Sequence, residues 1–185
     1  MTRLSTNLTL AYSCLAHAYT HMFVLLYATV VLVLEREWGL TFSELQWLSV
    51  PGFVMFGVAA LPAGWLGDKW SSPGMMVVMF FGLGIASFIV GMAEGTTGIL
   101  IGLTLMGTFA AIYHPVGISM LLKSDKRIGL RLGINGVFGN LGVAAAPVFI
   151  GAILLNGDWR MGFWVSGVLC LIYGVLFASR LRHEP

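Results

Sequence analysis

Three histidines stand in stretches of the sequence that are otherwise almost entirely apolar. His17 and His21 are four residues apart in AHAYTH, and His114 lies in AIYHPVG. Residues four apart share one face of a helix, and histidine changes its charge between about pH 5 and 8. The three rings could therefore contact an anionic substrate, pass on a proton, or bind zinc or copper as neutral ligands.

The composition indicates that these histidines are surrounded by a lipid bilayer. Of the 185 residues, 58% are hydrophobic and 10% are charged, whereas a soluble domain carries about 25% charged residues. The sequence has no basic run with interleaved aromatic residues, so a nucleic-acid partner is not expected. Cys14 and Cys170 lie in apolar runs, which predicts two buried thiols rather than a disulfide or a metal-binding pair.

Six apolar segments are close to the roughly 20 residues that a membrane-spanning helix needs. They cover approximately residues 8–34, 44–66, 74–93, 98–122, 130–155 and 161–179. The first is too long for the core of a signal peptide and no cleavage site follows it, so we expect it to be retained. The sequence thus predicts an all-α membrane protein, with residues 1–185 forming one domain of six transmembrane helices.

Basic residues are distributed unevenly between the two ends of the predicted helices. With the N-terminus inside, eight Lys and Arg residues fall on the inner side, and only Arg36 and Arg160 fall outside. The inner residues are Arg3, Lys69, Lys123, Lys126, Arg127, Arg131, Arg180 and Arg182. Because cytoplasmic loops carry the excess of basic residues, we expect both termini in the cytoplasm and the bacterial inner membrane as the location.

Few polar side chains lie at membrane depth. No Asp, Glu, Lys or Arg lies well inside any predicted helix, and ionisable groups at that depth are candidates for function. With two polar neighbours, the histidines form the predicted substrate-binding or proton-coupling set: His17, His21, Tyr113, His114 and Asn135. The alternative is that each histidine is neutral and hydrogen-bonded to a neighbouring helix.

The sequence GWLGDKW follows the second predicted helix on the cytoplasmic side. Gly64 and Gly67 allow a neighbouring helix to approach closely, and Asp68 precedes Lys69 where the chain must turn. An aspartate there can face a helix N-terminus, where negative charge is favourable. These four residues form a predicted gating motif; the alternative is an ordinary polar turn.

The fifth predicted helix contains small residues at regular intervals. Gly133, Gly142, Pro147 and Gly151 would give a flat face for another helix, and a proline within a helix bends it. The alternative is the small-residue packing that is common in membrane helices.

These two motifs resemble those of the major facilitator superfamily. Gly64, Asp68 and Lys69 match the family's motif between its second and third helices, although Ser71–Pro73 replace the later part of that motif. The fifth helix is similar to the motif of the antiporter branch, with alanine and isoleucine in place of two of its glycines.

Two features of the predicted first and fourth helices narrow the resemblance. Tyr113 to Pro115 and His17 are similar to fosmidomycin-resistance-type exporters, which carry an aspartate where His21 stands. Leu103, four residues before Gly107, occupies a position where the family usually has an arginine that is often linked to proton coupling. Proton coupling through that arginine is therefore not expected.

The resemblance implies one half of a twelve-helix transporter, built from two three-helix inverted repeats. In the family, the first and fourth helices line a central cavity. At 1.5 Å per residue, His17 lies about 14 Å, His21 about 20 Å and His114 about 12 Å from the inner ends of their helices. The resemblance thus implies that the three histidines share the cavity.

The expected function is transport of a small molecule by alternating access, as ion-coupled efflux that needs a second six-helix half. The expected partners are the substrate, with an anion among the candidates, a proton, the lipid bilayer, and a second half or a second copy. Enzymatic activity, a cofactor and a metal are not expected. Two alternatives are a non-transporting subunit or truncated remnant, and an intramembrane metal site at the histidines, for which no carboxylate is nearby to orient the rings.

Overall fold

The described part of the chain is entirely helical. The computed structural model describes residues 5–124, 126–155 and 157–183, and for residues 182 and 183 it describes the backbone alone. Arg3 and the side chain of Arg182 therefore lie outside the described part. The helices and two π-helical turns are α1 (Thr6–Trp38), α2 (Phe42–Trp47), α3 (Val50–Val58), α4 (Ala60–Leu66), η1 (Gly67–Ser71), α5 (Ser72–Gly91), α6 (Thr96–Ala110), η2 (Tyr113–Gly117), α7 (Ile118–Leu122), α8 (Ile128–Leu154) and α9 (Trp159–His183). No strand is assigned in these ranges, which confirms the predicted all-α class.

Helix α1 begins and ends at recognisable signals. The hydroxyl of Ser5 accepts a hydrogen bond from the backbone N–H of Leu8 at 3.5 Å, and Gly39 ends the helix with a φ of 65°. A left-handed residue at this position is usual for glycine. The helix extends beyond the apolar segment 8–34 because its last turn is built from glutamate and arginine, which are good helix formers.

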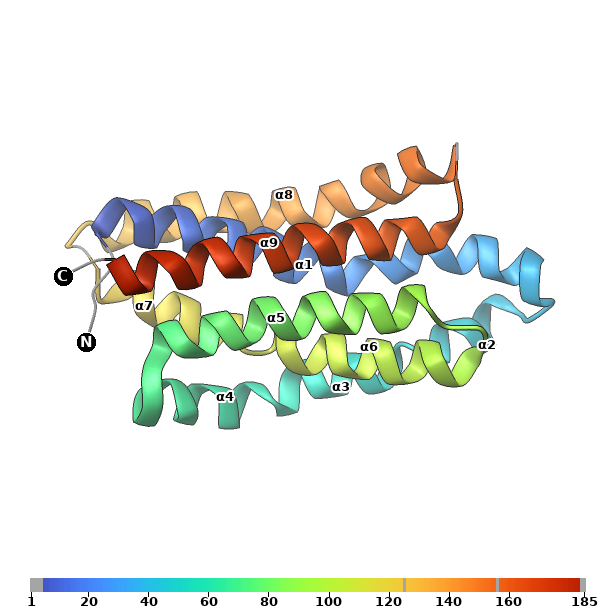
Figure 1. The fold of residues 1–185 in the computed structure, drawn as a ribbon, viewed down its shortest axis with the longest axis horizontal. Coiled ribbons are helices and arrows are strands. Elements are labelled where there is room, and N and C mark those ends of the chain that lie inside the picture. Colours follow the sequence, from blue (N-terminus) through green and yellow to red (C-terminus); the bar gives the residue numbers. More distant parts are fainter. Residues whose placement is uncertain (1–4, 125, 156, 184–185) are drawn as a thin grey trace.

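Five helical stretches are long and apolar enough to cross a membrane, and one of them is Phe42–Gly91 with 50 residues. This stretch contains the predicted segment 44–66 and most of 74–93. The chain stays helical between them, but it reverses direction at η1, so that α4 and α5 run in opposite directions (Figure 1). Six spanning helices therefore stay a prediction, whereas helices of spanning length and apolarity are confirmed.

The predicted segment 98–122 is interrupted at its centre. Helix α6 ends at Ala110, and η2 and α7 continue to Leu122. The interruption contains Pro115, which lacks the N–H that a helix needs for its bond to the preceding turn. A π-helical turn accommodates this loss and changes the direction in which the neighbouring side chains point.

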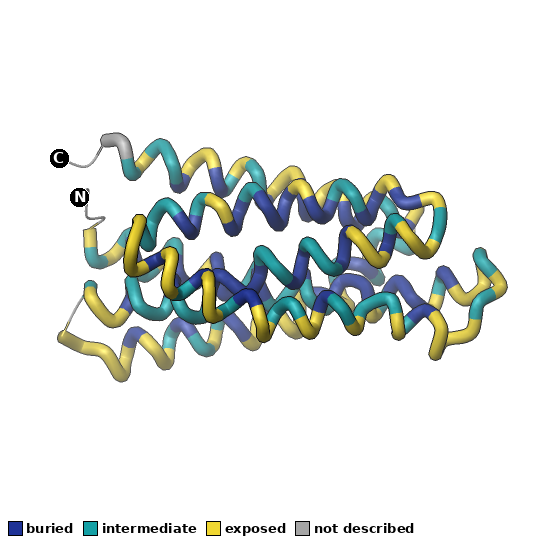
Figure 2. Tube along the Cα trace, turned by 90° about the horizontal axis from the view of Figure 1, so that it is seen from below, coloured by how far each residue is buried: buried dark blue, intermediate teal, exposed yellow. Residues whose placement is uncertain are grey.

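The helices pack side by side, and both ends of the described chain lie at the same end of the bundle (Figure 1). The most extensive packing joins α1 to α8, α5 to α9, α5 to α6, and α3 to α6. Buried and exposed residues alternate along the helices (Figure 2). Many exposed residues are large and apolar, including Leu61 and Leu155, each 82% exposed, as expected for a surface that contacts lipid.

Two pairs of helices approach until their backbones touch. A Cβ atom at Gly142 of α8 would collide with the backbone of Ala18 in α1, and a Cβ atom at Gly107 of α6 would collide with the backbone of Gly52 in α3. Small residues at such crossings allow close packing in membranes. We call these the α1–α8 crossing and the α3–α6 crossing.

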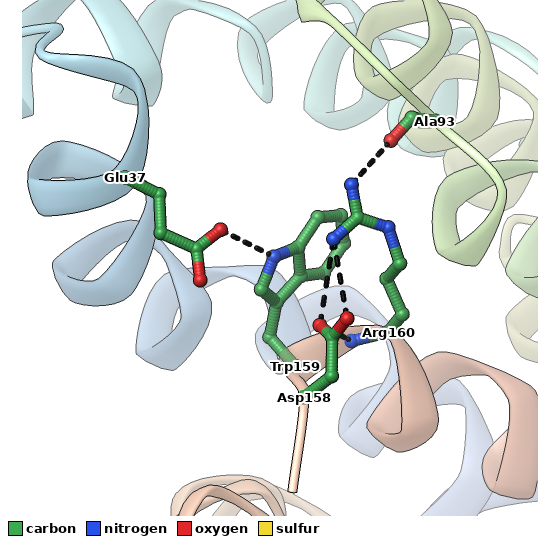
Figure 3. Close-up of polar contacts among 5 residues, drawn as sticks. All are labelled: Glu37, Ala93, Asp158, Trp159 and Arg160. Atoms are coloured by element: carbon green, nitrogen blue, oxygen red, sulfur yellow. Dashed lines mark hydrogen bonds and ion pairs between the residues drawn. The ribbon is translucent and has the colours of Figure 1, made fainter.

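The end of the bundle opposite the termini is held by polar contacts. The indole N–H of Trp159 donates to Glu37 at 3.1 Å, and Arg160 donates to the carbonyl of Ala93 at 3.1 Å while pairing with Asp158 at 3.3 Å (Figure 3). These contacts join the end of α1, the segment between α5 and α6, and the start of α9. Trp159 is fully buried, so this end is packed as well as hydrogen-bonded.

Candidate functional site

The three predicted histidines come together between α1 and η2. One ring nitrogen from each of His17, His21 and His114 lies within 4.8 Å of the other two. Nε2 of His17 and Nε2 of His21 are 3.0 Å apart. The ring of His114 stands edge-on to both, with its centroid 5.4 Å from that of His17 and 5.5 Å from that of His21. The four-residue spacing along α1 puts two rings on one face, and η2 brings the third against them.

Hydrogen bonds fix which nitrogen of each α1 histidine carries the proton. Nδ1 of His17 lies 2.9 Å from the backbone carbonyl oxygen of Asn135 in α8. A carbonyl oxygen can only accept, so Nδ1 of His17 is protonated. When the ring is neutral its Nε2 bears a lone pair, and His21 must donate to it through its own Nε2–H. The lone pair of His17 therefore points at the other histidines.

Tyr113 and Asn135 complete the group. The ring of Tyr113 stacks on that of His17 with centroids 4.8 Å apart and planes 21° apart. Its hydroxyl lies 3.0 Å from Oδ1 and 2.7 Å from Nδ2 of Asn135. We call these five residues, His17, His21, Tyr113, His114 and Asn135, the polar cluster. The structure brings all five predicted residues together.

The polar cluster is buried on one side and reaches the surface on the other. Tyr113, Asn135 and His17 are buried, whereas His21 and His114 are half-buried. Within the described residues, no buried side-chain nitrogen or oxygen lacks a hydrogen-bond partner. A ligand would therefore approach from the side of His21 and His114, while the buried members hold the rings in place.

Gly139 is a member of the site that sequence reasoning missed. A Cβ atom at this residue of α8 would lie 2.6 Å from Cε1 of His17, which is too close for any side chain. The absence of a side chain leaves the space that the imidazole fills. The sequence shows glycines at intervals along this helix, but the rotation of the helix relative to α1 cannot be read from one sequence.

The predicted gating motif packs against the turn that carries His114. A Cβ atom at Gly64 would lie 3.1 Å from Cβ of Pro115, and one at Gly67 would lie 2.9 Å from Cγ2 of Val116. The motif is not an irregular loop, because Gly64 belongs to α4 and the following residues form η1. Close packing to η2 thus connects the motif directly to the polar cluster.

The charged half of the motif faces another helix end. The carboxylate of Asp68 lies 3.7 Å from Nζ of Lys123, which follows α7, and both side chains are largely exposed. Lys69 is exposed as well. An open hollow of about 850 Å³ lies beside this pair. Its lining comprises Thr6, Thr9, Gly67, Asp68, Trp70, Ser71, Ser72, Pro73, Gly74, Met120, Lys123, Ser124 and Leu181, none of which belongs to the polar cluster.

The predicted motif of the fifth helix lies within α8 and points in two directions. Gly142 packs against α1, but nothing in the described structure lies within 4 Å of a Cβ atom built at Gly133 or Gly151. Pro147 lies inside the helix and is exposed. Only one of the four motif residues is therefore used for packing between the described helices.

Comparison with known proteins identifies a family. Residues 12–185 match the family described as Major Facilitator Superfamily. The tetracenomycin C resistance and export protein of Streptomyces glaucescens is 24% identical over 180 residues, covering 92% of this chain and 33% of its own length. The puromycin resistance protein pur8 of Streptomyces alboniger is 27% identical over 158 residues, covering 82% of this chain and 31% of its own.

A third relative is named as a sensor rather than as a resistance or export protein. The membrane sensor protein UhpC of Salmonella typhimurium is 24% identical over 148 residues, covering 79% of this chain and 34% of its own length. The chain thus spans about a third of the length of these curated relatives.

Proposed function

Since the chain belongs to the Major Facilitator Superfamily, we propose that it is half of a membrane transporter that moves a small molecule by alternating access. The observation that carries this proposal is the polar cluster, which lies between α1, η2 and α8 in a bundle of apolar helices. Ionisable groups inside a membrane protein mark the path of a substrate or ion. The names of two relatives as resistance or export proteins favour efflux.

The proposed half has six spanning helices in two inverted repeats. A straight helix of 50 residues would be about 75 Å long, more than twice the roughly 30 Å of a bilayer core. The stretch Phe42–Gly91, which reverses at η1, therefore crosses twice. The two glycine crossings support the repeats, because α1 crosses α8 in the same way that α6 crosses α3.

A second half completes the transporter in this proposal. The relatives are about three times as long as the matched region, and no atom of the described residues lies within 4 Å of a Cβ atom built at Gly133 or Gly151. Their face of α8 suits a second six-helix unit or a second copy of this chain. The polar cluster would then line the cavity between the two units, with His21 and His114 facing the substrate.

Asp68 and Lys123 form the proposed gate at the end of the bundle that carries the termini. Because the gating motif packs on η2, movement of α4 would be transmitted to His114. Asp68→Asn should reduce transport while the protein still reaches the membrane, and Gly64→Leu should reduce it further because it adds bulk against Pro115. Unchanged flux in both variants would exclude the gate.

Flux measurements test the proposed site. Inverted vesicles that contain the chain and its completing unit would be assayed with a panel of labelled anions and uncharged drugs. His17→Gln and His114→Gln should each lower flux at least tenfold at equal membrane abundance, whereas His21→Asp, the residue of similar exporters, should retain activity. Full flux in both glutamine variants would exclude the polar cluster as the substrate site. Proton coupling by these histidines stays a prediction.

Labelling of introduced cysteines tests the proposed sidedness, with both termini in the cytoplasm. An impermeant thiol reagent added outside a bacterial cell should react at positions 37, 94 and 158 but not at 69 or 126. Reaction at position 126 from outside would reverse the assignment.

The second candidate function is that of a non-transporting membrane subunit. It is favoured by the sensor protein among the relatives, which carries that name within the same family. A sensor would bind its ligand at the polar cluster but would show no flux. Ligand-induced protection against unfolding without flux in vesicles would favour this candidate over transport.

A further inference from the structure

The histidines of the polar cluster have the arrangement of metal ligands. Three imidazoles offer one nitrogen each within 4.8 Å of the others. In a four-coordinate site with bonds of about 2.0–2.1 Å, ligand nitrogens are about 3.3 Å apart. The nitrogens of His17 and His21 already stand 3.0 Å apart. To close the site, His114 has to approach by at most about 1.5 Å, and the two rings that now hydrogen-bond to each other have to turn their nitrogens toward the ion. Two histidines four apart on a helix are a spacing used by zinc sites.

The surroundings of His17 also match those of a metal ligand. A ligating histidine usually donates its other ring N–H to a carboxylate, a backbone carbonyl or water, which orients the ring. Here Nδ1 of His17 donates to the carbonyl of Asn135 at 2.9 Å, and Tyr113 stacks on the ring. The sequence disfavours a metal because no carboxylate is near to orient the rings. A backbone carbonyl can orient a ligating histidine equally well, and it leaves no signal in the sequence.

We propose that His17, His21 and His114 bind one divalent transition-metal ion of the zinc, copper, nickel and cobalt class, which favours imidazole ligands. On binding, His21 carries its proton on Nδ1, so that its Nε2 lone pair replaces the hydrogen bond to His17 with a bond to the metal. The ion joins α1 to η2. Three neutral ligands leave its charge uncompensated, and the half-exposed side of the site leaves a fourth position open to water or an anion.

Cobalt provides the direct test, because four-coordinate Co²⁺ has strong visible absorption. The full chain, purified without a polyhistidine tag and stripped with a chelator, would be titrated with Co²⁺ in lipid nanodiscs and then with competing Zn²⁺. We expect one ion per chain. His21→Gln and His114→Gln should each weaken binding at least tenfold, whereas His183→Gln, which changes the fourth histidine of the sequence, should bind as the native chain does.

Two further measurements separate ligand loss from misfolding. His114→Cys should keep the ion and add the near-ultraviolet band of a cobalt–thiolate bond. Zn²⁺ should raise the unfolding temperature of the native chain but not of the double glutamine variant, in which His21→Gln and His114→Gln are combined. Equal binding by the double glutamine variant and the native chain would overturn the proposal, and so would equal loss in His183→Gln. The site goes beyond the proposed transport function, and since no substrate is needed for the titration, either proposal can fail without the other.

Discussion

The α1–α8 and α3–α6 crossings share the same kind of backbone contact, but the side chains around them differ in polarity. At each, a glycine lets one helix touch the backbone of another. The α1–α8 crossing has His17 and Asn135 beside it, joined by a hydrogen bond. A small hollow of about 20 Å³ lies between the α3–α6 crossing and α1, lined by Phe23, Val24, Tyr27, Ser49, Gly52, Phe53, Leu103, Met106 and Gly107.

The difference shows that the scaffold does not require the polar residues. The α3–α6 crossing packs closely with apolar neighbours, so a glycine and matching surfaces suffice to hold two helices together in a membrane. Close packing alone therefore gives no reason for the histidine and the asparagine at the other crossing, in keeping with the proposed role of the polar cluster. Leu103 fits this view, since it is 6% exposed and stands where the family usually has an arginine.

Filling either crossing should have the largest effect. Gly142→Val and Gly107→Val each place a branched side chain where a single Cβ already collides with backbone, and we expect each to abolish folding. Gly136→Val is the control, because no atom of the described part of the chain lies within 4 Å of its Cβ position. Size-exclusion profiles and unfolding temperatures would show the contrast. A Gly142→Val protein as stable as Gly136→Val would mean that the close approach is not essential.

Removing side-chain volume at the α3–α6 crossing should lower the stability of the protein without affecting flux or cobalt binding. Met106 is 2% exposed, and Met106→Ala should cost about 2 kcal/mol or more in the free energy of unfolding, as cavities in packed interiors do. Met106→Leu, which conserves volume, should cost less than about 1.5 kcal/mol. Cobalt affinity should be native in both, and a tenfold change would show that the two crossings are coupled.

A pair of matched tyrosine variants separates packing from function. The hydroxyl of Tyr27 donates to the carbonyl of Leu45 at 2.9 Å beside the α3–α6 crossing. The hydroxyl of Tyr113 is hydrogen-bonded to Asn135 in the polar cluster. Each Tyr→Phe change should cost about 0.6 kcal/mol, and at most about 1.7, as for other hydrogen bonds within membranes. Only Tyr113→Phe should also weaken flux and cobalt binding. Equal functional loss in Tyr27→Phe would contradict this assignment.

The smallest effect is expected at Ser49. Its hydroxyl donates to the carbonyl of Gln46 at 2.7 Å, but the backbone N–H of Ser49 donates to the same oxygen at 3.0 Å. Ser49→Ala therefore leaves no group without a partner and should change the unfolding free energy by less than about 0.5 kcal/mol. A larger loss, measured by thermal unfolding, would give the α3–α6 crossing a polar role.

Much of the candidate site could be predicted, because the types of its side chains and their spacing in the sequence indicate which of them lie together. Histidines four apart must share a helix face, and in an apolar chain few other residues can join them. What could not be predicted depends on the rotation of each helix about its axis. Gly139 beneath His17 and Gly64 against Pro115 are contacts between helices distant in the sequence, and the carbonyl of Asn135 is a backbone group that every residue carries.

The positions of the breaks between helices could be predicted where apolarity changes sharply, but the local conformation at a break could not. The break after Gly39 was visible because charged residues and a glycine coincide there. Between α4 and α5 the sequence GDKWS has the composition of a loop, yet it forms η1. Two hydrogen bonds stabilise that turn. The N–H of Gly74 donates to the hydroxyl of Ser71, and the hydroxyl of Ser72 donates to the carbonyl of Gly67.

The length of α1 determines where its C-terminal end lies relative to the lipid. Its 33 residues make a rod about 50 Å long, and a tilt of more than about 50° would be needed to contain it in a 30 Å hydrocarbon layer, beyond the usual range. The last turns, with Glu35 and Glu37, must therefore protrude into the headgroup layer. The bond from Trp159 to Glu37 then forms at the wet rim of the bilayer, so thicker or thinner membranes would change how much water reaches that carboxylate.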